Sequence, residues 1–390
     1  MFDIERAKQM EKATGHSYCS PSQLYRIILC PGSLGEATKA PIQPPSQYAN
    51  EGTRKHGLTF KLLDTGSKAV LAGEIEEVRQ EILACQDYVK DLEKCKRKQI
   101  GRWWNEKVVD LSPWGFPDIW GTSDFGYLWN DGRVDVIDWK FGSGVTVYAK
   151  DNAQLMTYAA GAIGYPDDKN LTIHLHIVQP PVNHFDEYVI SFTDLEKWVF
   201  ETLEPALITA KEPNPPFKAG EYQCKFCPAS MTCKFRYQDA VKKAKEVFGV
   251  YKQDLSTVNK TQLANIMEKI NDIKSYASQI AIFATNELAA GKDFPGYKLV
   301  SGRSNRSWVD EDKTLDWLKG NSSIAEDQLH KKKLVSPAQA EALDRHLKKD
   351  STFENLYHKP QGKPQLVTVD DPRKALKPSS VAAEVFKDSV

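Results

Sequence analysis

Alternation of apolar and polar positions is clearest between residues 103 and 191, where it predicts a series of strands. The runs 121–129 and 132–140 are rich in β-branched and aromatic residues, and Asn130-Asp131-Gly132 lies between them. An Asp-Gly pair between two such runs is a strong signal for a hairpin. Two further strands are predicted at 172–178 and 184–190.

Helical patterns surround these strands. Apolar spacing predicts helices at 47–64, 73–97 and 151–164. Thr193 and Glu196 fit a capping box, which predicts the start of a helix that continues to about Lys211. The order helices, hairpin, helix, strand, strand, helix predicts an α/β fold with one mixed central sheet flanked by helices.

The pattern changes after the middle of the chain, where a long helix is predicted at about 259–290. The 390 residues are enough for two or three domains at about 150 residues each. We therefore expect a core domain at 1–245 and an accessory domain at 246–390, the latter a mostly helical α+β extension.

Composition narrows the function classes. Apolar residues make up 41% and charged residues 27%, as in ordinary globular proteins. Because Lys plus Arg and Asp plus Glu both number 52, the zero net charge excludes a polycation that coats nucleic acid, and any DNA contact must be local. The charged N-terminus and the lack of long apolar runs predict no membrane association and a cytoplasmic location.

Acidic residues on the predicted hairpin form a candidate catalytic site. Asp138 and Lys140 lie two apart, so they share a face of one strand, and the hairpin brings Asp124 close to Asp138. Two neighbouring carboxylates favour a cation such as Mg²⁺ or Mn²⁺ between them. A lysine at the same cation suits hydrolysis of a phosphodiester. An ordinary amphipathic hairpin with a solvated Asp and Lys face is an equally weighted alternative on spacing alone.

Cysteines form a second candidate site. The chain has seven, and Cys224, Cys227 and Cys233 lie close together with the spacing C-x₂-C-x₅-C. Metal sites of this type normally use four ligands, so a fourth must come from elsewhere in the chain. Four thiolates suit either zinc or an iron–sulfur cluster.

The order of motifs resembles the RecB-like branch of the PD-(D/E)XK nucleases. The matching segments are Gly52-Thr-Arg-Lys-His56, Gly121-Thr-Ser-Asp124, Asp138-Trp-Lys140 and Gln154-Leu-Met-Thr-Tyr158. The resemblance implies a restriction-endonuclease-like core in which His56, Asp124 and Asp138 bind Mg²⁺ or Mn²⁺. It also implies that Lys140 serves the attacking water, and that Gln154 and Tyr158 line the DNA side. Glu106, just before the strand region, is a further candidate acidic contributor, with a surface glutamate of a strand as the preferred interpretation.

The N-terminal segment Ser20-Pro-Ser22-Gln-Leu24 followed by Cys30-Pro31 resembles the S-x-S-x-L…C-P element of iron–sulfur RecB-like nucleases. In these nucleases one cysteine before the core joins three after it around a structural [4Fe–4S] cluster. The resemblance implies that the ligands here are Cys30, Cys224, Cys227 and Cys233. Cys19 precedes the element and does not match it, and zinc remains the chemical alternative.

The segments 296–308 and 362–367 resemble the C-terminal part of a phage and prophage protein family. The combined resemblance implies a DNA exonuclease that processes ends in phage recombination or replication, in the host cytoplasm. A single-strand annealing or single-strand-binding protein is the expected partner. Two alternatives stay open: a catalytically inactive DNA-binding or assembly component, and a zinc-stabilised RNA nuclease. Cleavage polarity, strand preference and oligomeric state do not follow from these motifs.

Overall fold

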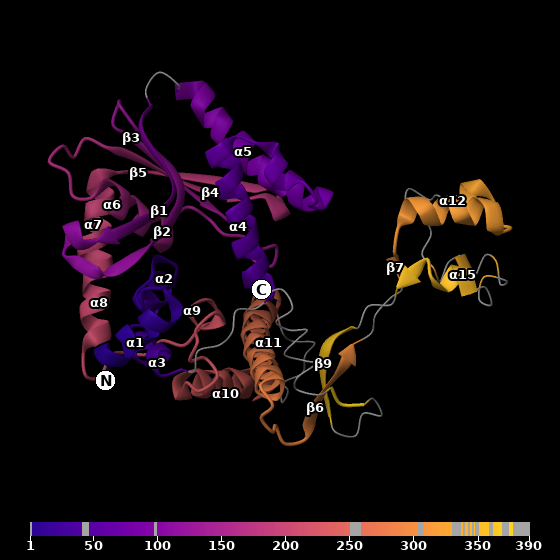
Figure 1. The fold of residues 1–390 in the computed structure, drawn as a ribbon. Coiled ribbons are helices and arrows are strands. Elements are labelled where there is room, and N and C mark those ends of the chain that lie inside the picture. The colour runs from indigo at the N-terminus through magenta and orange to yellow at the C-terminus, as the bar shows by residue number, and fades with distance from the viewer. Residues whose placement is uncertain are drawn as a thin grey trace. The chain divides into compact units, whose positions relative to one another are not determined.

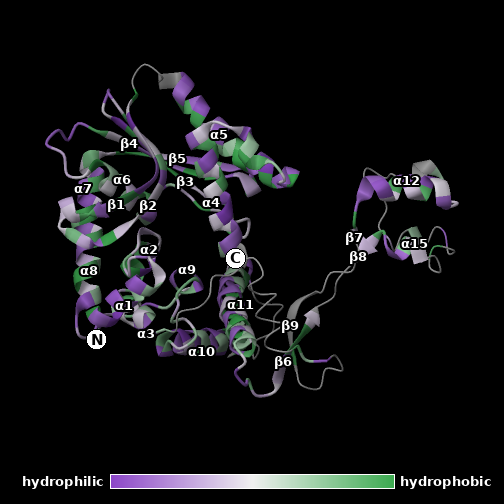
Figure 2. Ribbon diagram, in the orientation of Figure 1, coloured by the Kyte–Doolittle hydropathy of each residue, from purple (hydrophilic) through white to green (hydrophobic). Residues whose placement is uncertain are grey.

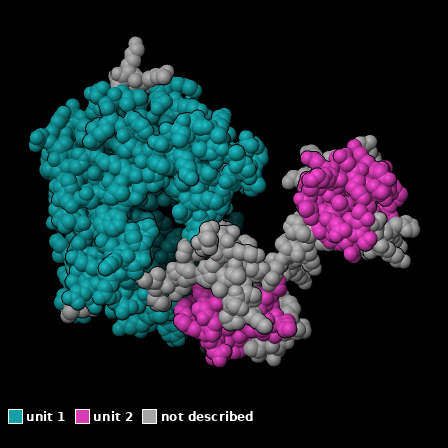
Figure 3. All heavy atoms as spheres, viewed as in Figure 1, with its two compact units in different colours: residues 1–280 teal, residues 281–390 magenta. Residues whose placement is uncertain are grey.

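The computed structural model of the chain describes residues 2–40, 47–96, 100–249, 259–302 and 307–329, with shorter stretches between 337 and 376. The chain divides into two compact units, residues 1–280 and 281–390 (Figure 3). The first unit contains the central sheet and all the predicted site residues.

The sheet of the first unit has five strands in the order β1-β2-β3-β4-β5 (Figure 1). Only β3 and β4 are parallel, and the other neighbours are antiparallel. The predicted α/β class, with a mixed central sheet flanked by helices, is confirmed. The strands are β1 (Ile100–Leu111), β2 (Phe116–Trp129), β3 (Arg133–Trp139), β4 (Thr172–Gln179) and β5 (His184–Ser191).

The predicted hairpin joins β2 to β3. Phe125 pairs with Ile137, and Leu128 pairs with Val134 next to the turn. Gly132 ends this turn with φ of 83°, a left-handed conformation that glycine adopts without steric cost. The Asp-Gly signal was therefore read correctly.

One face of the sheet is covered by α2 (Pro21–Leu29), α6 (Ala153–Ile163) and α7 (Phe192–Trp198). Val134 and Val136 of β3 pack there against α6, which forms the crossover between the parallel strands β3 and β4. The Asn152 side chain begins α6 by accepting hydrogen bonds from the backbone N–H groups of Gln154 and Leu155. The helix start thereby fixes the position of Gln154 relative to the strand ends.

The opposite face is covered by α5 (Glu76–Lys96), whose Cys85 and Val89 pack against aromatic residues of β2 and β3. The neighbouring helix α4 (Gln47–Thr65) contacts α5 through Leu62 and Ile82. Figure 2 shows polar and apolar turns mixed along α5, as expected for a helix with one buried face.

The helix after β5 begins two residues earlier than predicted. Ser191 is the N-cap of α7: its hydroxyl accepts from the Asp194 N–H, and the Asp194 carboxylate accepts from the Ser191 N–H. The predicted capping box of Thr193 and Glu196 is therefore wrong, because β5 runs directly into the helix and leaves no loop. The helical segment continues through η5 (Val199–Leu203) and α8 (Glu204–Lys211), ending where predicted.

The remaining helices of the first unit connect these layers. They are α1 (Ile4–Thr14), α3 (Ser33–Lys39), η1 (Lys68–Leu71), η3 (Ser112–Trp114), η4 (Pro180–Val182), α9 (Glu221–Lys225) and α10 (Lys234–Gly249). The long predicted helix is α11 (Lys260–Ala289), and the division between compact units falls within it, after Ile280. The domain boundary at 245/246 stays a prediction.

The second unit contains two small antiparallel sheets, β6 with β9 and β7 with β8. Trp308, Leu318 and Phe353 are part of its main apolar core. Residues 303–306 of the segment that resembles the phage family lie outside the described residues. The elements are β6 (Tyr297–Gly302), β7 (Ser307–Trp308), α12 (Glu311–Asn321), α13 (Glu326–Leu329), α15 (Ser351–Glu354), β8 (Tyr357–His358) and β9 (Gly362–Thr368). Among the described helices, none is both long and apolar enough to cross a bilayer.

Candidate active site and cysteine site

The six predicted catalytic residues meet at one end of the central sheet. They come from four places in the chain: His56 from α4, Asp124 from β2, Asp138 and Lys140 from the end of β3, and Gln154 and Tyr158 from α6. The sequence separates the first and last of these by about a hundred positions, and the sheet brings them together.

Asp124 is held between β3 and α4. Its Oδ2 accepts a hydrogen bond of 2.8 Å from the Trp139 backbone N–H, which ties β2 to the end of β3. Its Oδ1 lies 3.4 Å from Nδ1 of His56. Asp124 is only 7% exposed, so the carboxylate has a fixed orientation toward the histidine.

Asp138 and Lys140 form the predicted pair, with Lys140 Nζ 2.7 Å from Asp138 Oδ2. Gln154 connects them to α6: its Oε1 accepts from Lys140 Nζ at 3.0 Å, and its Nε2 donates to Asp138 Oδ1 at 3.1 Å. The same Nε2 lies 3.0 Å from the Tyr158 hydroxyl. One helix turn of α6 therefore orients both the acid and the lysine of the D-x-K motif.

Glu106, which the sequence favoured as a surface glutamate, lies next to the candidate site. Its carboxylate, a His56 ring nitrogen and an Asp124 carboxylate oxygen all lie within 4.8 Å of one another. Glu106 lies in β1 with φ of 53°, which is rare for a residue with a side chain and interrupts the regular strand conformation. Strand alternation assumes regular backbone angles, so it does not reveal where this side chain points.

The acidic groups of the site raise one another's pKa. Burial raises the pKa of Glu106, and the charge of Asp124 adds to this effect. Burial also raises the pKa of Asp138, against the opposing charge of Lys140. For His56, burial favours the neutral ring, but Asp124 outweighs it and raises the pKa of the imidazole. Among the described residues, the site thus contains three carboxyl groups but only Lys140 and His56 as positively charged partners.

A divalent cation fits this set of donors. The carboxylates of Glu106 and Asp124 and the imidazole of His56 each place one ligand atom within 4.8 Å of the other two. Oxygen donors suit Mg²⁺ and Mn²⁺, and an imidazole shifts the preference toward Mn²⁺. Asp138 is outside this group of three and is directed at Lys140 instead. The residues that best fit a cation therefore overlap the predicted set and add Glu106 to it.

The four predicted cysteine ligands line one cavity. Cys30 follows α2, Cys224 belongs to α9, and Cys227 and Cys233 lie between α9 and α10. Within the described part of the chain, no three cysteine sulfurs lie within 4.8 Å of one another. Four thiolates on one zinc ion would be closer, because Zn–S bonds of about 2.3 Å place the sulfurs about 3.8 Å apart.

Hydrogen-bond donors approach three of the four sulfurs. The backbone N–H of Lys218 lies 3.3 Å from Sγ of Cys30, and that of Gly220 lies 3.5 Å from Sγ of Cys224. Arg26 Nη1 lies 3.7 Å from Sγ of Cys227. Cys19, the upstream alternative, is fully buried elsewhere in the apolar core.

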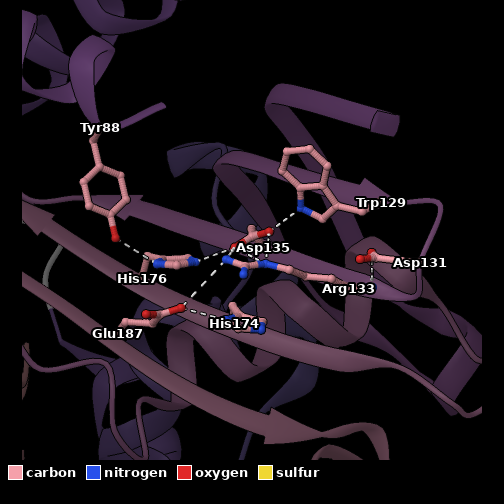
Figure 4. Close-up of polar contacts among 8 residues, drawn as sticks. All are labelled: Tyr88, Trp129, Asp131, Arg133, Asp135, His174, His176 and Glu187. Atoms are coloured by element: carbon pink, nitrogen blue, oxygen red, sulfur yellow. Dashed lines mark hydrogen bonds and ion pairs between the residues drawn. The ribbon is translucent and has the colours of Figure 1, made fainter. Parts of the chain in front are cut away.

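A polar cluster on the α5 side of the sheet was not predicted (Figure 4). Asp135 is fully buried and accepts hydrogen bonds from His176 Nε2 at 2.8 Å, from the Arg133 guanidinium and from the Trp129 indole. The other nitrogen of His176 lies 2.9 Å from the hydroxyl of Tyr88 on α5. Asp135 and the two histidines of β4, His174 and His176, also have ligand atoms within 4.8 Å, but Arg133 already supplies the cation.

These observations define an α/β protein with an acidic site at a sheet end and a separate four-cysteine cavity. The sequence matches a protein family described as "Protein of unknown function (DUF2800)" over residues 16–374, and the chain belongs to this family. A solved structure titled "Crystal structure of SSO0001" is similar at 14% identity, covering 60% of this chain and 95% of that chain with a TM-score of 0.25.

Proposed function

We propose that the chain is a metal-dependent DNA nuclease of the RecB-like PD-(D/E)XK type. The observation that carries the proposal is the connected acidic site, in which Asp124, Asp138 and Lys140 have the contacts that phosphodiester hydrolysis requires. An ordinary solvated hairpin face does not explain an Asp138 that is 2% exposed and bonded to both Lys140 and Gln154.

His56, Glu106 and Asp124 would hold the cation, and Asp138 borders it. A bound divalent cation supplies a Lewis acid that polarises a phosphate oxygen and lowers the pKa of a bound water. Lys140 holds its ammonium against Asp138 and would stabilise negative charge on the attacking oxygen there. Gln154 prevents Lys140 and Asp138 from separating, because it bonds to both.

We further propose that the four cysteines hold a structural [4Fe–4S] cluster, with zinc as the alternative. The position of all four cysteines in the lining of one cavity and the backbone N–H groups directed at Cys30 and Cys224 support a metal–thiolate group there. For biological role, the resemblances support an exonuclease that processes DNA ends in phage recombination or replication, together with a single-strand annealing or binding protein.

The test is degradation of linear and circular DNA with Mg²⁺ or Mn²⁺, comparing the wild type with Asp138→Asn. The matched control is Asp110→Asn, the same chemical change at an exposed carboxylate near the end of β1. We expect wild type and control to degrade linear DNA and Asp138→Asn to be at least about a hundredfold slower. Equal rates for all three proteins would remove the proposed site, and cleavage of circles would make the enzyme an endonuclease.

Two outcomes of the same assay lead to the alternatives. DNA binding without cleavage, with anaerobically prepared protein and either cation, favours the inactive DNA-binding component. Cleavage of RNA but not DNA by protein that contains zinc and no iron favours the RNA nuclease.

A further inference from the structure

Arg26 is a buried cation without a carboxylate partner among the described residues. It lies on α2, one turn before Cys30, and is 1% exposed. Its guanidinium donates to two neutral acceptors, the Ser33 carbonyl at 3.1 Å and Gln23 Oε1 at 2.6 Å. Burying a charge without an opposite charge is unfavourable, so a buried arginine at this position indicates an anionic partner.

The remaining contact of Arg26 points to that reason. Nη1 lies 3.7 Å from Sγ of Cys227, one of the four cysteines that line the cavity. A thiol sulfur is a weak acceptor, whereas a metal-bound thiolate is anionic and accepts hydrogen bonds well. Four thiolates around one zinc ion or one [4Fe–4S] cluster leave a net negative charge on the group. A cation directed at one of the sulfurs is the complement of such a charge.

Arg236 provides an internal comparison. It is also fully buried and lines the same cavity, yet it has its own counter-ions: Nη2 lies 2.7 Å from Asp272 Oδ1, and Nη1 lies 3.5 Å from Asp239 Oδ2. The acidic residue of the cavity lining, Glu36, pairs with Lys39 at 2.8 Å. Of these charged groups only Arg26 is left without an opposite charge.

We propose that Arg26 is the counter-cation of an anionic metal–thiolate group held by Cys30, Cys224, Cys227 and Cys233. The proposal rests on the proposed cysteine cofactor and is independent of the nuclease chemistry. The single helix α2 then supplies both a ligand, Cys30, and a compensating charge, Arg26, to the same group. Arg26 is a positioning residue, because it acts through the sulfur of Cys227.

The test compares wild type with Arg26→Gln, Arg26→Lys and the control Arg79→Gln, an exposed arginine of α5. Iron, sulfide and zinc per chain are measured after anaerobic purification, followed by the rate of metal release to a chelator. We expect Arg26→Gln to release the metal about tenfold faster than wild type, Arg26→Lys to be intermediate, and Arg79→Gln to match wild type.

The thermal midpoint of loaded and metal-stripped protein gives the second readout. In the loaded state Arg26→Gln should unfold at a lower temperature than wild type. In the stripped, reduced state Arg26 faces neutral thiols, so Arg26→Gln should unfold at the same temperature or higher. Equal destabilisation of both states would overturn the proposal in favour of simple packing. If Arg26→Gln does not fold, Arg26→Lys serves as the test variant. The proposal is overturned if Arg26→Lys releases metal at the wild-type rate and its stripped form is less stable than stripped wild type.

The two proposals fail separately. Protein that contains no metal in the cysteine site but still cleaves DNA with Mn²⁺ would overturn the role of Arg26 and leave the nuclease intact. A site loaded with metal and sensitive to Arg26→Gln, in a protein that cleaves nothing, would support the role of Arg26 and reject the nuclease.

Discussion

At the scale of single side chains, the acidic site depends on Gln154, which bonds to Asp138, Lys140 and Tyr158 at once. The sequence motifs predicted that Asp138 and Lys140 share a face and lie near Asp124, but gave no information on the bonds from Gln154 to Asp138 and Lys140. The position of Glu106 beside His56 and Asp124 was not the preferred interpretation, because regular strand alternation does not account for a residue with a left-handed backbone conformation.

Replacing Glu106 should weaken binding of the catalytic cation. Glu106→Gln keeps the size of the side chain but removes one of the two carboxylates that converge with His56. We expect Mn²⁺ affinity to fall by about ten- to a hundredfold, with DNA cleavage falling in parallel at limiting Mn²⁺. Calorimetric titration of Mn²⁺ measures this, with the exposed Glu201→Gln as a control. Unchanged affinity would return Glu106 to a surface role.

Cation binding should also depend on pH through His56. The pKa of His56 is raised in the folded protein, and a protonated imidazole cannot bind a metal. Mn²⁺ affinity should therefore begin to fall while the pH is still above about 6.5, the ordinary pKa of histidine. In His56→Asn this part of the profile should be absent. An identical acid limb in both proteins would show that another group is responsible.

At the scale of elements, the polar cluster around Asp135 ties together β3, β4 and α5. Tyr88 reaches His176 from the helix, and His176 bonds to Asp135 across the parallel pair (Figure 4). Along β3, Asp135 and Ile137 face α5, whereas Val134 and Val136 face α6. The cluster therefore fixes the strand whose next residues carry the acidic site.

Asp135→Asn should destabilise the fold in a pH-dependent way. Although burial opposes it, hydrogen bonds from His176 and Arg133 hold the pKa of Asp135 well below its usual range. The carboxylate therefore stabilises the fold at pH values above about 3.9, and this stabilisation is lost as the pH falls toward the lowered pKa. We expect a loss of about 3 kcal/mol at pH 7 that shrinks below pH 4, measured by urea unfolding. Asp87→Asn, on the exposed face of α5, should change little.

The sequence predicted the helices and strands themselves better than the contacts between them. The strands β3, β4 and β5, the second half of β2, the hairpin and α6 were predicted because alternation and turn residues are local signals, whereas β1 was not assigned as a separate strand. The Asp135 cluster was missed because it depends on the register that pairs Asp135 with His174 on a strand far along the chain. No local pattern specifies which strand becomes the parallel neighbour of β3, and that choice decides which buried polar residues meet.

At the scale of the whole molecule, the cysteine cavity brings together the chain segments that precede and follow the central sheet. Cys30 lies before all five strands, and the other three cysteines follow the last helix of the sheet layer. Because the proposed metal group would link the chain across such a long loop and restrict the unfolded chain, its loss should lower the stability of the full fold.

Removal of metal should therefore lower the stability of the whole chain and loosen the helices that flank the cavity. After chelation we expect the thermal midpoint of the full chain to fall by several degrees, and trypsin to cut near α2 and α10 faster. A Cys85→Ala variant serves as a control, because that cysteine is buried against the sheet and does not line the cavity. A midpoint that does not change on metal removal would contradict a structural role.

The separation of Cys30 from Cys224 also orders events during synthesis. A ribosome makes Cys30 long before the sheet exists, and the first complete set of ligands appears only after Cys233 has emerged. Every strand of the central sheet and all seven acidic-site residues have been made by then. If the four cysteines hold the proposed cofactor, its loading can be complete only after Cys233 has emerged, and a chain that stops before Cys233 would lack one of the four proposed ligands even with its sheet formed.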